Sequence, residues 1–358
     1  MKKEKHNGII GIWKFIFAIV IMLFHSRRLY IDLDTSLFKG GYIAVEFFFI
    51  VSGFYFAKNT LKEYYKKETI GKETINLIWK KIKVFFPYIL VAYLINVIVK
   101  IIFSKFKIVS IVNSIWNLLL LKEFGFRGPI YSGQLWYLSV IFISLFILYP
   151  LVKKYKKNFI QLYSPIIVIF ILGALNRYKL GLDHSYANWI GYMNTGILRG
   201  FADINIGMLI YLLNEKLKNV EYTKLGKIVL SLISEGLLIL VLLITSKMKN
   251  FVHYDYVMLL FIVVSVTIMV SKKTIEYELL SNKISNYLEK ISLPIFINHS
   301  AIIDLCFYSS LIKLSPVKLT IIVVISTILL SIIEMQLIKL IKKKQLISKC
   351  SKLIIKSY

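Results

Sequence analysis

A lysine and a histidine, separated by ten residues, lie in one apolar stretch near the start of the chain, GIWKFIFAIVIMLFHS. Ionisable side chains within an apolar segment are costly, so they often mark a functional site. On an α-helix, Lys14 and His25 lie within about 20° of one face and about 16 Å apart along the axis. An amine holds phosphate, and an imidazole removes a proton near neutral pH. The stretch therefore predicts an anion-binding group at one level and a general base at another, although a lone lysine here also fits simple anchoring at the head groups.

The next apolar stretch, GGYIAVEFFFIVSGFYFA, contains a single carboxylate, Glu46. This stretch must run back through the same layer, so we expect Glu46 to lie at a depth comparable to that of His25. A carboxylate there would accept a hydrogen bond from one imidazole nitrogen and raise the basicity of the other. Ser52 and Gly53 follow, and small residues let helices or a ligand approach closely. We therefore predict that Glu46 orients His25.

Later apolar stretches contain further polar groups. Arg199 and Asp203 are spaced i and i+4, so they share a helix face as an ion pair or as part of a site wall. His299 either bonds to a neighbouring helix or lines the site. Trp136 and Tyr137 begin another apolar run, where aromatic residues commonly mark the membrane interface. Each of these side chains has a structural as well as a functional interpretation.

The elements that must position these residues are apolar helices. Of the 358 residues, 57% are hydrophobic and 18% are charged, whereas soluble domains are about 45–50% apolar and about 25% charged. An apolar run of about 20 residues spans a bilayer as a helix. The composition therefore excludes a soluble globule and predicts an all-α polytopic membrane protein with about ten transmembrane helices. The predicted spans are 8–25, 40–57, 84–103, 134–152, 159–175, 197–213, 226–244, 254–270, 291–310 and 317–340.

Two other segments have the character of surface helices. Residues 58–83 are rich in Lys and Glu and predict an amphipathic helix along the cytoplasmic face. Residues 108–121 are too short for a confident span, so we expect an interfacial or re-entrant segment. Residues 1–345 would form one membrane domain, and residues 346–358 a short basic cytoplasmic tail.

The distribution of charge predicts the orientation and limits the partners. The formal net charge of +27 is compatible with nucleic-acid binding, but Lys and Arg cluster in short segments between the apolar runs, as membrane topology requires. Segments on the side of the N-terminus hold roughly twice as many Lys and Arg residues as those on the other side, which places both termini in the cytoplasm. We therefore expect contact with membrane lipids and no nucleic-acid partner. Cys306 and Cys350 lack metal-ligand spacing, and we expect no metal site.

At these residues the chain resembles the acyltransferase type 3 family of integral membrane O-acyltransferases. A basic residue, ten residues and a histidine precede GGYIAVEFFFIVSGF, and LWYL and LPIFINH follow in order along nearly the whole chain. The first two motifs in succession are fairly specific. The usual arginine of the first motif is Lys14 here, which keeps the charge but loses the planar fork that grips phosphate. The acidic position, often aspartate, is Glu46.

The resemblance implies transfer of an acyl group, most often acetyl from acetyl-CoA, to a hydroxyl of a carbohydrate or related cell-envelope acceptor at the cell membrane. The acyl-CoA is then a co-substrate, with no permanently bound cofactor. His25 would act as the general base and Glu46 would orient it. Lys14, Trp136 and Arg199 would contact the donor, and either Arg199 or His299 would stabilise the oxyanion. The remaining candidates line the site: Ser52, Tyr137, Asp203 and His299.

Two other functional classes compete with this interpretation. A transporter or flippase of an envelope precursor would use the same buried charges to line a polar pathway, although the two halves of the chain show no repeat. A membrane scaffold would need a structural partner for each buried charge. The hydrolase-like fusion common in the family is absent from the sequence, so we expect transfer within the membrane domain, in a homo-oligomer, or with a separate extracytoplasmic partner.

Overall fold

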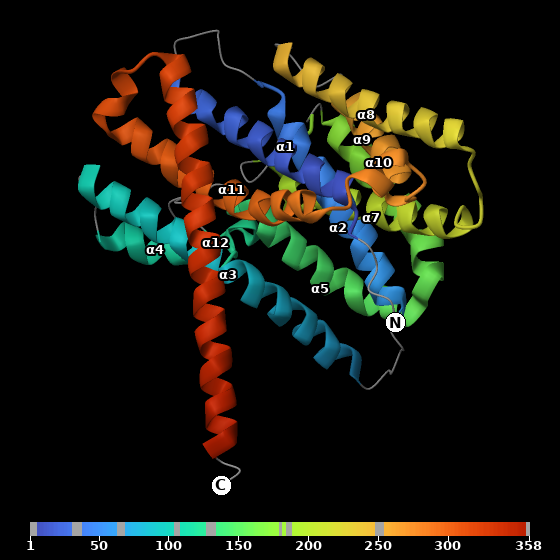
Figure 1. Cartoon of the computed structure of the whole chain (residues 1–358), viewed down its shortest axis with the longest axis horizontal. Helices are drawn as coiled ribbons and strands as arrows, with labels where there is room; N and C mark the ends of the chain where they lie inside the picture. Colours follow the sequence, from blue (N-terminus) through green and yellow to red (C-terminus); the bar gives the residue numbers. More distant parts are fainter. Residues whose placement is uncertain are drawn as a thin grey trace.

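The computed structural model describes residues 6–30, 38–62, 69–103, 108–126, 134–178, 181–183, 188–247 and 254–355. Within these residues the chain is a bundle of α-helices with one short antiparallel hairpin, in which Trp189 pairs with Asn194 (Figure 1). The elements are α1 (Gly8–Ser26), α2 (Ala44–Lys62), α3 (Ile70–Phe103), α4 (Ile108–Leu118), α5 (Leu135–Asn158), α6 (Ser164–Arg177), β1 (Trp189–Ile190), β2 (Met193–Asn194), α7 (Thr195–Lys216), α8 (Lys224–Lys247), α9 (Asp255–Val270), α10 (Ile275–Leu279), α11 (Lys283–Tyr308) and α12 (Pro316–Ile355).

The helices have the length and composition expected of membrane spans. Among the described residues, 8 helical stretches are long and apolar enough to cross a bilayer. One of them, Leu135–Arg177, combines α5 and α6, which meet near a bend at Lys156, and the apolar α9 is shorter, at 16 residues. Each of the ten predicted spans coincides with a helix. The all-α polytopic class is therefore confirmed, while the exact number of spans and the orientation stay predictions.

The segment between the second and third predicted spans folds differently from the expectation. The predicted separate surface helix at 58–83 is wrong for the described residues, because residues 58–62 end α2 and residues 70–83 begin α3. The helix α3 continues for 34 residues and contains Pro87. The basic start of α3 is thus rigidly joined to its apolar continuation. By contrast, the predicted short segment at 108–121 matches the 11-residue helix α4.

The predicted boundary at residue 345 does not coincide with the end of a helix. The helix α12 continues through it to Ile355, and Figure 1 shows this helix extending well beyond the rest of the bundle toward the C-terminus. Residues 356–358 of the predicted basic tail lie outside the described residues. A 40-residue helix is about 60 Å long, about twice the thickness of a bilayer core. One end of α12 must therefore project out of the apolar layer.

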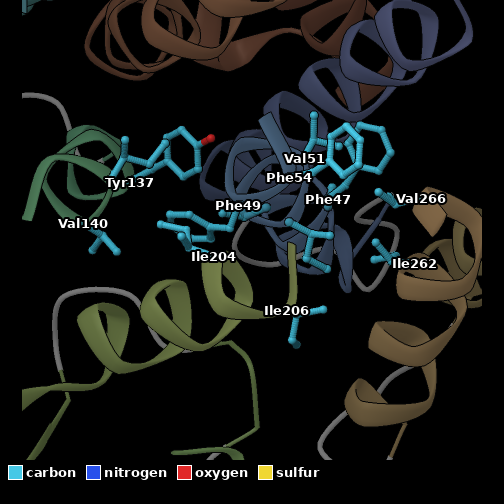
Figure 2. Close-up of a cluster of buried hydrophobic side chains, with 14 of the residues drawn as sticks. Phe47, Phe49, Val51, Phe54, Tyr137, Val140, Ile204, Ile206, Ile262 and Val266 are labelled. Carbon is cyan, nitrogen blue, oxygen red and sulfur yellow. The ribbon is translucent and has the colours of Figure 1, made fainter. Parts of the chain in front are cut away.

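The helix α2 lies in the middle of the bundle, between α5, α7 and α9. Figure 2 shows Phe47, Phe49, Val51 and Phe54 of α2 surrounded by side chains of these three helices. The neighbours labelled there are Tyr137 and Val140 of α5, Ile204 and Ile206 of α7, and Ile262 and Val266 of α9. Aromatic side chains bury large areas and prefer tilted contacts, such as that between Phe49 and Tyr137 at 4.5 Å between ring centroids. This packing fixes the position of the Glu46-bearing helix.

Two glycines let α2 and α7 touch backbone to backbone. A Cβ atom on Gly53 would overlap the carbonyl oxygen of Ile204, and one on Gly207 would overlap the carbonyl oxygen of Ile50. The close approach predicted at Ser52 and Gly53 is therefore confirmed. Small residues drive helix association in membranes by permitting such contacts.

Gly53→Ala should destabilise the protein, because the added methyl group must separate α2 from α7. We expect a loss of about 1–3 kcal/mol, the usual effect of overpacking, measured by thermal unfolding in detergent. Gly173→Ala is the matched control, since a Cβ on Gly173 meets no atom within 4 Å. Equal unfolding temperatures for the two variants would contradict the tight α2–α7 contact.

Candidate active site

The helices α1 and α11 cross so that two histidines meet inside the bundle. Nε2 of His299 lies 3.0 Å from Nδ1 of His25, and the two rings are nearly parallel, with 16° between their planes. The side chain of His299 is fully buried. Nδ1 of His299 lies 3.3 Å from the carbonyl oxygen of Ile295, one turn earlier in α11. The two histidines, 274 residues apart in the chain, thus form one hydrogen-bonded pair.

The hydrogen bonds define the tautomers of the neutral pair. A carbonyl oxygen only accepts, so Nδ1 of His299 carries the hydrogen toward Ile295. The lone pair of His299 Nε2 must then accept from Nδ1 of His25. This leaves Nε2 of His25 without a hydrogen and with its lone pair directed away from His299. The arrangement makes His25 Nε2 the basic atom of the pair.

Three contacts from other helices hold the His299 segment in place. The amide of Gln134, just before α5, donates to the carbonyl oxygen of Ile297 and to the hydroxyl of Ser300 at 2.8 Å. The amide of Asn298 donates to Glu334 of α12 at 2.6 Å. The helices α5 and α12 therefore fix α11 on both sides of His299. Gln134 was not among the predicted site residues, although it directly precedes the LWYL motif.

Glu46 has a different partner from the one predicted. Its carboxylate accepts a hydrogen bond from Nε of Arg199, and both side chains are almost completely buried. Nη2 of Arg199 also donates to the carbonyl oxygen of Tyr42 at 2.9 Å. The expected hydrogen bond between Glu46 and His25 is therefore replaced by an ion pair. The physical reason is that a buried guanidinium requires a carboxylate, whereas a neutral imidazole is satisfied by a second imidazole.

Arg199, Asp203 and Trp136 complete this charged cluster. Asp203 is fully buried beside Glu46, within electrostatic range of Arg199. The guanidinium of Arg199 lies 5.5 Å from the ring centroid of Trp136, a cation–π distance. Arg199 and Asp203, spaced i and i+4 on α7, therefore both face Glu46 of α2. The predicted donor contacts of Trp136 and Arg199 gain no support, since neither lines a cavity that Lys14 lines.

A second polar contact holds Leu182, which precedes β1 in the chain, against this cluster. The carboxylate of Asp255, at the start of α9, accepts from the Tyr42 hydroxyl at 2.6 Å and from the backbone N–H of Leu182 at 2.5 Å. Asp183 follows, within electrostatic range of Arg27 and Arg199. These groups belong to the same end of the bundle as His25. They were not among the predicted site residues.

Lys14 lies near the opposite end of α1 and is paired with an acid. Its Nζ lies 2.5 Å from the carboxylate of Glu289 in α11, which also lies 3.2 Å from His6. Two cavities adjoin it, a polar cavity of about 420 Å³ and an apolar cavity of about 400 Å³. Both are lined by Lys14, Ser52 and Lys81. The predicted placement of Lys14 and Ser52 in one site is consistent with this geometry.

Lys81 is a cationic residue of this site that sequence analysis did not single out. It faces both cavities and lies within electrostatic range of Lys14. Among the described residues it has no carboxylate within ion-pair distance, whereas Lys14 has Glu289. Two ammonium groups at the junction of two cavities repel each other unless an anion lies between them. Lys81 could not be distinguished in the sequence, because lipid anchoring explains all the lysines of 58–83 equally well.

Aromatic side chains separate the apolar cavity from the histidine pair. Phe48, Tyr137 and Phe296 line this cavity and contact one another, with 5.2 Å between the ring centroids of Tyr137 and Phe296. The Tyr137 hydroxyl forms a hydrogen bond with Ser52. The ring of Phe296 also lies 6.0 Å from that of His299. Neither histidine lines the cavity itself, so Phe296 lies between the cavity and His299.

A comparison with protein families connects this arrangement to an activity. The family described as "Acyltransferase domain" matches residues 7–335, nearly the whole chain. The chain belongs to this family. Its fold and family make it a membrane acyltransferase, as the sequence resemblance predicted. No curated protein and no solved structure shows significant similarity to the chain.

Breaking the buried ion pair of this acyltransferase should weaken the contact between α2 and α7. Arg199→Met leaves Glu46 and Asp203 without their cation, and we expect a loss of about 3–5 kcal/mol in unfolding free energy. Adding Glu46→Leu to Arg199→Met removes one of the two carboxyls that lack a cation. The double variant should therefore recover part of the lost unfolding free energy. A double-mutant cycle followed by thermal unfolding measures the coupling. Additive effects of the two changes would show that the pair has no energetic role.

Proposed function

We propose that this protein is an O-acyltransferase of the cell membrane that transfers an acetyl group from acetyl-CoA to a hydroxyl of a cell-surface or lipid-linked carbohydrate. His25 is the general base in this proposal. The observation that carries it is the hydrogen bond from His25 to His299, which leaves Nε2 of His25 able to accept a proton. The family match independently supports acyl transfer as the reaction class.

The reaction needs one base that works in both directions. Nε2 of His25 takes the proton of the acceptor hydroxyl, while the oxygen of that hydroxyl forms a bond to the carbonyl carbon of the thioester. The carbon–sulfur bond then breaks, and the imidazolium returns the proton to the departing thiolate. Protons and charge balance without a further reactant. His299 is fully buried and His25 is partly buried, which limits the access of water that would otherwise hydrolyse the thioester.

His299 takes the orienting role that sequence analysis assigned to Glu46. Its Nε2 accepts from His25 Nδ1, which fixes the imidazole tautomer as the acid member of a catalytic triad does. Both nitrogens of His299 are then engaged, one with Ile295 and one with His25. His299 therefore has no N–H left to stabilise an oxyanion. The alternative role predicted for His299 is thus less consistent with the geometry.

The two cavities beside Lys14 support a donor that enters from the end of the bundle opposite to His25. The polar cavity offers Lys80, Lys81, Asn59 and Asn76 for a nucleotide with phosphates. The apolar cavity continues toward Phe296 and suits the thinner pantetheine arm. A rotation of the Phe296 ring would connect this arm to the histidine pair. The axial distance of about 16 Å between Lys14 and His25 matches the scale of that arm.

His25→Ala should abolish transfer, because loss of a general base lowers the rate by about 10²–10⁴-fold. His299→Ala should lower kcat by a smaller factor and leave the KM for acetyl-CoA unchanged, since His299 bonds to His25 and lines neither cavity beside Lys14. Purified protein in detergent is assayed for labelled acetyl transfer to cell-envelope glycans. A His25→Ala variant as active as the parent would remove the assignment of the base. An intact protein that transfers no label but moves a glycolipid across proteoliposomes would instead support the flippase alternative.

Lys81→Gln should raise the KM for acetyl-CoA about tenfold, since a charge-assisted hydrogen bond contributes about 1.5 kcal/mol or more. Lys83→Gln is the matched control, because Lys83 lies over the ring of Trp79 and lines neither cavity. Both variants lose one positive charge from α3. The donor assignment fails if the two variants have the same KM.

A further inference from the structure

A third cavity lies on the other side of α2 from the two cavities beside Lys14. It has a volume of about 420 Å³ and is formed by the ends of α2 and α7 and the segment after α9. We call it the basic cavity, after Lys58, Lys62, Lys218, Lys272 and Lys273 in its lining. The ring of Tyr55 separates it from the donor side, with Lys14 and Lys58 at 5.9 and 5.8 Å from its centroid.

The charge in the basic cavity is strongly unbalanced. Five lysines line it, and Glu215 is the one carboxylate among its described lining residues. Three helices end at this cavity, and each helix C-terminus carries about half a negative charge. The combined contribution of Glu215 and the helix ends, about two and a half negative charges, is smaller than that of the lysines. Among the described groups that line the cavity, formal positive charge therefore exceeds negative charge.

Several donors around the basic cavity have no acceptor among the described residues. Nδ2 of Asn214 is buried there without a hydrogen-bond partner. Within the described part of the chain, Lys62, Lys218 and Lys273 have no carboxylate within ion-pair distance. A buried amide donor without an acceptor is costly. A ligand that supplies several negatively charged oxygens would satisfy the amide and the lysines at once.

We propose that the basic cavity binds a phosphate group, either that of an anionic phospholipid or that of a soluble phosphate compound. Phosphate provides the oxygens that Asn214 and the lysines require, and lysine binds it as a point charge. The apolar wall of Phe54 and Val270 accommodates the carbon atoms attached to the phosphate. The positive-inside rule places this cavity on the cytoplasmic side, where anionic lipid is found. The site shares no lining residue with the donor cavities.

The test compares two probes on the full-length protein in phosphatidylcholine nanodiscs. One arm replaces part of the lipid with phosphatidylglycerol and counts the retained anionic lipids by native mass spectrometry. The other arm measures binding of inorganic pyrophosphate by calorimetry. The cavity variant is Lys62→Gln, Lys218→Gln and Lys273→Gln combined. Its matched control, Lys283→Gln, Lys339→Gln and Lys342→Gln combined, removes the same charge from exposed positions outside all three cavities.

We expect the parent and the control to bind one of the two probes, and the cavity variant to bind it at least about tenfold more weakly. Weaker retention of phosphatidylglycerol by the cavity variant identifies a lipid head group as the ligand. Weaker binding of pyrophosphate by the cavity variant identifies a soluble phosphate. If the cavity variant does not fold, Asn214→Asp tests the same site with an isosteric change and should weaken the same probe. Equal binding by parent, cavity variant and Asn214→Asp overturns the proposal. Pyrophosphate binding that only Lys81→Gln weakens belongs to the donor site and counts against the basic cavity.

Discussion

An ionisable side chain inside an apolar layer must have a partner, and this constraint explains how the helices of this acyltransferase are arranged. Arg199 has Glu46, Lys14 has Glu289, and His25 has His299. Each pair joins helices that are far apart in the sequence, so each also determines which helices touch. Removing one partner would leave an unpaired polar group in a medium of low dielectric constant. This loss of folding free energy is far larger than the net contribution of the pair. The polar contacts therefore specify the assembly, and the apolar packing around α2 supplies most of its stability.

The same constraint divides the molecule into two chemically different regions. At the level of His25, hydrogen bonds of α11 with Gln134 and α12, and the one between the two histidines, hold the buried polar side chains in place. Around Lys14 and Lys81 the cations outnumber the acids and adjoin open space. The proposed transfer from acetyl-CoA depends on both features, the hydrogen-bonded histidine pair and the cationic side chains beside the cavities. Phe296 lies between the two regions, since it lines the apolar cavity and contacts the ring of His299.

The elements of the fold could be predicted better than their junctions. Apolar runs of about twenty residues identify membrane helices with little help from tertiary structure, and each predicted span coincides with a helix. The continuous α3 could not be anticipated in the same way. Charged residues in 70–83 look like an independent surface segment, yet neither charge nor Pro87 interrupts the helix. Lys81 was overlooked for this reason, because its role depends on a cavity formed with α1 and α2.

The sequence by itself determined that Lys14 and His25 share one helix face, since helical geometry converts their spacing directly into direction and distance. It also determined the close approach at Gly53, because only a missing side chain permits backbone contact. Only the tertiary structure decided which buried polar side chains pair with one another. The sequence predicted Glu46 as the partner of His25, but Glu46 pairs with Arg199, 153 residues later, and His25 pairs with His299. Which buried charges pair depends on the positions of all of them in the folded bundle. The sequence of a single helix does not contain that information.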